Sequence, residues 1–106
     1  MTEIDIARQF SKAPGGRFRD DGKASGQEFR ESFLEPLFAD ATGQDKIRVI
    51  LDGSYGYPTS FLEEAFGGLA RKFGAARVLA RLDFISTEEP LLIDEIRSYI
   101  QTAEAT

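Results

Sequence analysis

The sequence predicts a single α/β domain in which about three helices pack against a mixed β-sheet. Short β-branched or apolar runs alternate along the chain with segments whose apolar residues recur at helical spacing. A length of 106 residues suits one hydrophobic core. We therefore expect one domain over residues 1–106, with a frayed tail over residues 102–106.

The N-terminal region is expected to contain a strand and a polar loop. Ile4, Ile6 and Phe10 alternate with polar residues, which indicates a first strand. Turn signals rich in glycine, proline and aspartate follow on both sides of residues 17–19. That short segment is therefore predicted to form a hairpin arm.

A first helix is expected to start near Gly26. Ser25 and Glu28 match the capping box, in which each side chain accepts a hydrogen bond from the backbone of the other residue. Pro36 removes one backbone donor and should kink or shorten the helix, and residues 41–43 should end the element. The apolar residues that recur at helical spacing are Phe29, Phe33, Leu34, Leu37 and Phe38.

The second half of the chain is expected to alternate strands and helices. Residues 47–51 form an apolar run typical of a buried strand, and residues 61–72 form an amphipathic helix that Gly74 ends. Residues 78–85 are apolar enough for another strand. A last helix follows, capped by Ser86 or Thr87, with Pro90 in its first turn. Its predicted buried stripe is Leu92, Ile93, Ile96 and Ile100.

The composition excludes several classes of function. The chain has no cysteine and no histidine, which rules out thiolate zinc sites, cysteine nucleophiles and most ordinary hydrolase mechanisms. A net charge of −5 argues against a nucleic-acid-binding surface. We find no apolar run that could span a membrane and no signal peptide, so a bacterial cytoplasm is the expected location. We expect a protein that binds and is not an enzyme, without cofactor or metal.

The helix over residues 61–72 contains two glycines that a helical wheel places on its exposed side. Together they cost about 2 kcal/mol relative to alanine, so their presence needs a reason. Either a neighbouring element of the same chain crosses closely there, or a partner's backbone approaches. On the second interpretation, the partner-facing strip consists of Ser60, Glu64, Gly67, Gly68 and Arg71.

The start of that helix carries two hydroxyl groups. Ser60 and Glu63 repeat the capping-box pattern, and Thr59 is a rival N-cap. Most such residues are simply caps. A helix N-terminus also stabilises an added phosphate through its free N–H groups and dipole, so the same position can act as a switch.

Three sequence blocks resemble one family. They are VILDGSYGYPTSFLEEAFGGL over residues 49–69, GRFR from Gly16, and SGQEFR from Ser25. They resemble the STAS-like domains of unknown function of prokaryotes, which are similar to the STAS domains of anti-anti-sigma regulators. In those regulators a strand leads through a turn into a helix, and a serine of the turn is phosphorylated by a partner kinase that is also the anti-sigma factor.

The resemblance places Ser60 at the modified serine and Thr59 just before it. Pro58 stands at the family's aspartate position and Phe61 at its small glycine position. The resemblance implies a protein partner of the histidine-kinase-type ATPase or anti-sigma-like kinase class. Tyr55 and Tyr57 of the same turn are expected to shape the surface that this partner contacts.

Other charged residues have weaker claims to function. Arg17, Arg19 and Lys23 could hold an anion, although such residues more often form a solvated loop. Asp52 ends the strand over residues 47–51, and we expect it to accept backbone N–H bonds in the turn through Gly53. Three functions stay open: a phosphorylation-switched regulatory module, an unmodified adaptor or self-associating domain, and, ranked last, a small enzyme using carboxylates.

Overall fold

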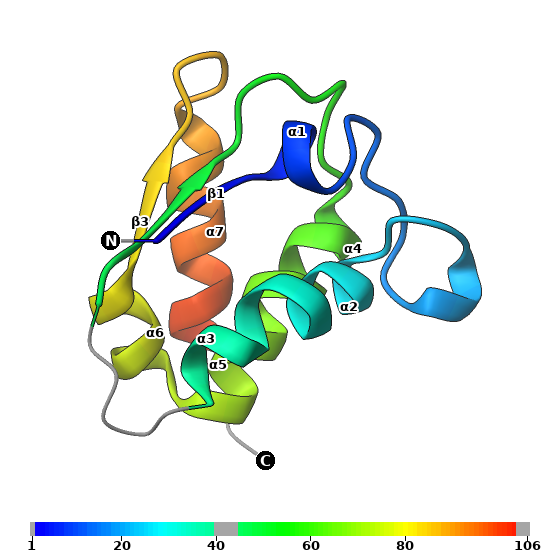
Figure 1. Cartoon of the computed structure of the whole chain (residues 1–106). Helices are drawn as coiled ribbons and strands as arrows, with labels where there is room; N and C mark the ends of the chain where they lie inside the picture. Colours follow the sequence, from blue (N-terminus) through cyan, green and yellow to red (C-terminus); the bar gives the residue numbers. More distant parts are fainter. Residues whose placement is uncertain (1, 40–44, 104–106) are drawn as a thin grey trace.

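The computed structural model describes residues 2–39 and 45–103, and its centre is a parallel β-sheet (Figure 1). Within these residues the sheet consists of β1 (Thr2–Asp5), β2 (Ile47–Ile50) and β3 (Leu82–Ile85), in that spatial order. Both strand pairs are parallel, so the chain crosses over between consecutive strands. The predicted α/β class is confirmed, although this sheet is parallel and not mixed.

The strand register gives the sheet a buried face and a polar face. Ile4 lies opposite Val49, and both side chains are buried. Side chains alternate across each strand, so the neighbouring positions point the other way. There the guanidinium of Arg48 lies 3.5 Å from the carboxylate of Glu3. The helical segments over residues 26–38, 59–73 and 91–102 gather on the buried side (Figure 1).

The first strand is shorter than the alternation of apolar residues predicts. β1 ends at Asp5, and the chain continues as the helical turn α1 (Ile6–Gln9). The Asp5 carboxylate accepts the backbone N–H of Arg8 at 3.2 Å and caps this turn. Phe10 follows the turn and packs its ring 5.3 Å from that of Phe29. The predicted strand assignment beyond residue 5 is therefore wrong.

The predicted hairpin arm at residues 17–19 is also wrong. This segment leads into a 3₁₀ turn, η1 (Arg19–Asp21). The Asp21 carboxylate accepts the backbone N–H of Phe18 at 2.9 Å, and this bond between residues three apart stabilises the tight turn. A side chain that satisfies nearby backbone donors competes with strand pairing, which explains the difference.

The first long helix covers residues 26–38 and changes geometry in its middle. It comprises α2 (Gly26–Phe29), the π-helical turn η2 (Arg30–Leu34) and α3 (Glu35–Phe38). The Ser25 hydroxyl accepts the N–H of Glu28 at 3.0 Å, so the predicted N-cap is confirmed. Pro36 lies in the first turn of α3, after the wider π turn. The predicted end at residues 41–43 lies outside the described residues.

The central helix covers residues 59–73 and contains a π-helical turn too. It comprises α4 (Thr59–Leu62), η3 (Glu63–Gly67) and α5 (Gly68–Phe73). Gly74 ends it with a φ of 95°, a conformation that favours glycine. The prediction of a helix that ends at Gly74 is confirmed.

The segment predicted as one strand over residues 78–85 divides into a helix and a strand. The helix α6 (Ala75–Arg81) starts directly after the glycine stop, and β3 begins at Leu82. Arg81 is buried and donates to the backbone carbonyls of Leu37, at 2.7 Å, and Asp45, at 3.0 Å. The guanidinium thus has partners inside the fold, where an unpaired charge would be costly.

The last helix, α7 (Leu91–Thr102), follows the predicted apolar pattern. Ile96 and Ile100 are fully buried, and Leu92 and Ile93 are packed against the core. None of the helices in residues 2–39 and 45–103 combines the length and apolar character that crossing a membrane requires.

The central helix lies between the first long helix and α7 (Figure 1). Its Phe61 ring is 6.0 Å from that of Phe29 on the first long helix. On the sheet side, the Phe66 ring meets that of Phe84 at 5.5 Å. Because packing surrounds it on more than one side, the central helix is buried over a wider arc than an ordinary amphipathic helix.

Candidate functional site

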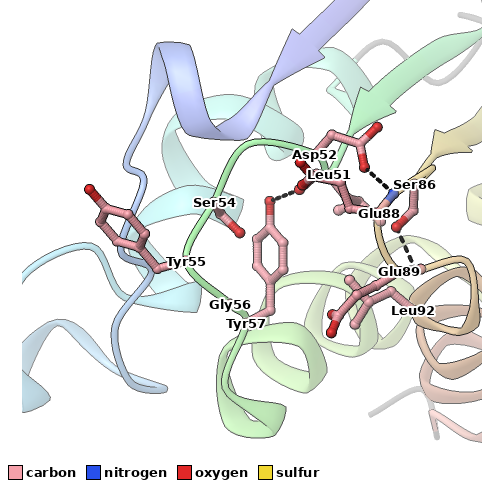
Figure 2. A pocket seen from close by; sticks show the side chains of 10 residues that line it. All are labelled: Leu51, Asp52, Ser54, Tyr55, Gly56, Tyr57, Ser86, Glu88, Glu89 and Leu92. Carbon is pink, nitrogen blue, oxygen red and sulfur yellow. Dashed lines mark hydrogen bonds between the residues drawn. The ribbon is translucent and has the colours of Figure 1, made fainter.

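The carboxyl ends of β2 and β3 lead into two loops that enclose a hollow of about 370 Å³ (Figure 2). One loop runs from Leu51 to Pro58 and the other from Ser86 to Pro90. Loops at the carboxyl end of parallel strands are a frequent place for binding sites in α/β folds. The lining residues are Leu51, Asp52, Ser54, Tyr55, Gly56, Tyr57, Ser86, Glu88, Glu89 and Leu92.

Asp52 joins the two loops. Its carboxylate accepts the hydroxyl of Thr87 at 2.7 Å and the backbone N–H groups of Thr87, at 3.1 Å, and Glu88, at 2.9 Å. The Glu88 carboxylate accepts the N–H of Gly53 at 2.8 Å in return. Asp52 therefore accepts backbone donors as predicted, but from the opposite loop and not from its own turn.

These bonds hold the Asp52 carboxylate in its ionised form. The N–H of Glu88 and the hydroxyl of Thr87 lower the pKa of Asp52, because both donate to the charged state. The group is thus suited to holding the loop in place rather than to releasing and taking up a proton near neutral pH.

Ser86 shapes its loop and does not cap α7. Its buried hydroxyl donates to the carbonyl of Glu89 at 2.6 Å. The helix begins later, at Leu91, where Pro90 is the N-cap residue and no side chain caps the first turn. The predicted caps at Ser86 and Thr87 are therefore wrong, since both hydroxyls have partners elsewhere in the loops.

The two tyrosines of the turn have different environments. Tyr57 points inward (Figure 2), and its hydroxyl donates to the carbonyl of Leu51 at 2.8 Å. Burial raises the pKa of Tyr57. Tyr55 points away from the hollow, and 85% of its surface is exposed. The backbone N–H of Tyr55 donates to the carbonyl of Lys12 at 2.7 Å, so the exposed ring stands on a fixed turn.

The predicted modification sites lie on the far side of this turn, outside the hollow's lining. The central helix begins at Thr59 with Pro58 as N-cap, and no side chain caps it, so the predicted capping box of Ser60 is wrong. Thr59 is exposed and Ser60 is half-buried. The Thr59 hydroxyl lies near that of Tyr99 on α7.

One family model matches this architecture. It describes a STAS-like domain of unknown function (DUF4325) and covers residues 25–92. The chain belongs to this family. The matched region contains the first long helix, the central helix and both loops of the hollow, whereas β1 and most of α7 lie outside it. Neither the curated proteins nor the solved structures include a match to the chain.

The predicted partner-facing strip on the central helix is covered by other residues of the same chain. Glu64 is 8% exposed, and Gly67 is buried. A Cβ atom at Gly68 would lie 2.5 Å from the guanidinium of Arg30 on the first long helix. The predicted exposure of the strip is therefore wrong. The alternative prediction, a close crossing within the chain, is confirmed.

A network of charged side chains fills this crossing. Arg30 donates to the carbonyl of Glu64 at 2.9 Å and also to its carboxylate, while its Nε donates to Glu35 at 2.8 Å. Burial would lower the pKa of Arg30, but these hydrogen bonds outweigh it and raise the pKa. Glu35 also accepts a hydrogen bond from the ammonium of Lys72 at 2.7 Å. The cations Arg30 and Lys72 therefore face the carboxylates of Glu35 and Glu64.

A second pair of cations reaches the same network from outside. Glu63 accepts Arg71 at 2.6 Å and Arg17 at 2.6 Å. The bond with Arg71 lowers the pKa of Glu63. Arg71 therefore contacts residues of its own chain and is not an open partner contact.

The predicted anion-binding loop is largely neutralised. Arg17 is paired with Glu63, and Arg19 lies 3.0 Å from the carboxylate of Glu31. Lys23 is exposed. Cations that already face carboxylates attract a further anion weakly, so the arrangement favours the solvated-loop alternative. Across residues 2–39 and 45–103, no cluster of acidic residues is arranged to hold a metal ion.

Sequence reasoning missed the contribution of the loop after β3. The sequence indicated a helix cap at Ser86 or Thr87, whereas the residues from Ser86 to Glu89 form one wall of a hollow together with the loop after β2. One signal was available: this loop follows a strand, as Asp52 does. The carboxyl ends of parallel strands meet at one edge of a sheet.

Proposed function

We propose that this STAS-like domain is a regulatory module that binds a protein partner through the turn from Tyr55 to Ser60. The exposure of Tyr55, at 85%, carries the proposal, because the ring stands on a turn whose backbone is fixed. An exposed aromatic side chain adds nothing to the core. Rigid aromatic anchors supply much of the binding energy in protein interfaces.

We further propose that phosphorylation at Thr59 or Ser60 regulates this contact. Thr59 is the more exposed of the two, and the helix that it begins has no side-chain cap. Free N–H groups and the helix dipole favour a phosphate there. Tyr99, which contacts Thr59, donates to Glu95 at 2.8 Å. A phosphate on Thr59 would therefore face an acid on α7 and disturb that contact.

The partner class that best suits the family resemblance is a histidine-kinase-type ATPase or an anti-sigma-like kinase. The test uses the full chain, ATP and the ATPase encoded by a neighbouring gene. We expect the intact mass to increase by one phosphate. The increase should vanish in Thr59→Ala or Ser60→Ala and persist in Thr102→Ala, a control at another exposed threonine. An unchanged mass in every condition would contradict the switch.

The second candidate is an adaptor that binds without modification. Stable binding of the same ATPase with no change in mass would favour it. The third candidate, a carboxylate enzyme, has less support from the hollow. Its Asp52 is held ionised by the opposite loop, whereas acid–base chemistry needs carboxyl groups whose pKa values differ widely.

A further inference from the structure

The start of α7 carries an apolar hollow with acidic borders. Pro90, Leu91 and Leu92 line a hollow of about 290 Å³, and Glu89 and Glu95 complete its lining. Leu91 is 78% exposed and adjoins Pro90 and Leu92 in this lining. An apolar patch rimmed by polar residues marks many protein-binding surfaces.

This apolar hollow is continuous with the hollow between the two loops. Glu89 and Leu92 line both. The combined surface therefore extends from the turn that carries Tyr55 to Leu91, with the Tyr55 ring directed outward at its border. These are the two most exposed of the large hydrophobic residues in the described part of the chain.

The electrostatic character of this surface is acidic. Neither hollow has a lysine or an arginine in its lining. Asp52 and Glu88 direct their charges at backbone donors of the facing loops. Within residues 2–39 and 45–103, by contrast, the Glu89 carboxylate has neither a hydrogen bond nor an ion pair. A carboxylate without a partner beside exposed apolar side chains favours a cationic group.

We propose that this surface binds a segment of the protein partner in which a lysine or arginine lies next to a large apolar side chain. The apolar side chain contacts Leu91 and Leu92, and the cation faces Glu89. This inference rests on the proposed function, because it specifies the chemistry of that partner. A second copy of the chain fits less well, since two copies would each carry a net charge of −5.

The test uses three synthetic peptides of equal length on the ¹⁵N-labelled full chain. The first has two leucines flanked by arginines, the second has glutamate in place of arginine, and the third has serine in place of leucine. We expect the first peptide alone to shift amide resonances around Tyr55 and from Glu88 to Leu92. Raised salt should weaken the binding.

Variants then test the two kinds of contact separately. Glu89→Lys and Leu91→Ser should each weaken the first peptide's binding about tenfold. Asp20→Lys reverses an exposed acid in η1 and should change affinity by less than about twofold. All three substituted positions are exposed, so the fold should be retained.

Several results would overturn the inference. Equal shifts with the glutamate peptide, shifts on another face, or equal weakening by Asp20→Lys would show that the surface lacks this specificity. A dimer in light scattering that Leu91→Ser dissociates would make a second copy the occupant. If the ATPase binds through Tyr55 but Glu89→Lys has no effect, this inference fails and the proposed function stands. If the ATPase does not bind, the proposed function fails too.

Discussion

Asp52 and Glu88 hold the two loops at the carboxyl end of the sheet together. The Asp52 carboxylate accepts the N–H of Glu88 at 2.9 Å, and the Glu88 carboxylate accepts the N–H of Gly53 at 2.8 Å. Hydrogen bonds to charged acceptors are stronger than those between neutral groups. This exchange holds together the loop that carries Tyr55 and the loop that leads into Leu91, as the proposed binding surface requires.

Removing the Asp52 carboxylate should loosen the loop after β3. We expect Asp52→Ala to lower the free energy of unfolding by about 1–2 kcal/mol, because backbone and hydroxyl donors lose their acceptor. Amide hydrogen exchange at Thr87 and Glu88 should accelerate. Asp20→Ala, at an exposed acid of η1, should stay within about 0.5 kcal/mol of the unsubstituted chain. Unchanged exchange at both amides would contradict the role of Asp52.

Stability should depend on pH mainly in the acid range. The pKa values of Asp52 and Glu63 are lowered in the folded state, by the donors of the facing loop and by Arg71 respectively. Their contribution is therefore complete above the unfolded pKa values, about 4, and is lost as the pH falls through the folded values. The chain has no histidine, so we expect little change between about pH 5.5 and 7.

Urea unfolding measured from pH 7 down to about pH 2.5 tests this dependence. Glu63→Gln removes one of the titrating groups, so its stability should fall less steeply with acid. An equally steep loss in Glu63→Gln would show that Glu63 does not contribute.

The buried pair of Arg30 and Glu64 should be strongly coupled. Arg30→Met leaves the Glu64 carboxylate, 8% exposed, without its main cation, and we expect a loss of about 3 kcal/mol. The double variant Arg30→Met/Glu64→Met removes both charges and should be more stable than Arg30→Met alone. A double-mutant cycle by urea unfolding measures the coupling. Purely additive losses would contradict it.

Two glycines at the helix crossing should differ in their tolerance of alanine. A Cβ atom at Gly26 would lie 2.5 Å from the carbonyl oxygen of Phe61, and that backbone cannot easily move. A Cβ atom at Gly68 meets the flexible end of Arg30 instead. We expect Gly26→Ala to cost about 2 kcal/mol or more and Gly68→Ala about 1 kcal/mol or less. Thermal unfolding ranks the two, and the reverse order would contradict this packing.

The larger substitution Gly68→Leu should destabilise the fold. If Gly68 lay on an exposed surface, the leucine would leave folding intact and would block binding of a partner. Here it would displace Arg30 from Glu64, so a lower unfolding temperature is expected. Normal stability with lost partner binding would instead support the original prediction of an exposed strip.

The sequence pattern predicted the inner side of the central helix and misplaced its outer side. Phe61, Phe66 and Leu69 are fully buried as predicted. Glu64 and Gly67 are not exposed, because the π turn η3 adds residues to one turn and the first long helix packs against it. A helical wheel drawn at 100° per residue accounts for neither the π turn nor the packing of the first long helix, since both depend on tertiary structure.

The predicted strand over residues 78–85 began too early, inside α6, because the apolar residues at its start were assigned to the strand. Val78 and Leu79 suggested a strand, although residues 75–81 are rich in alanine and arginine, which are strong helix formers. No hollow was predicted, although Asp52 and Tyr57, which line it, were singled out from their turn. Its other wall was not predicted, because the bonds from Asp52 to Thr87 join residues 35 positions apart and the strand before Thr87 was given the wrong start.

Binding of the neighbouring-gene ATPase to Tyr55→Ser tests partner recognition most directly. The matched control is Phe18→Ser, which removes another exposed aromatic side chain, next to η1 and outside the lining of both hollows. By isothermal titration calorimetry we predict that Tyr55→Ser weakens the affinity about tenfold or more, while Phe18→Ser leaves it unchanged. Equal affinity for Tyr55→Ser and the unsubstituted chain would contradict the proposal that this turn is where the partner binds.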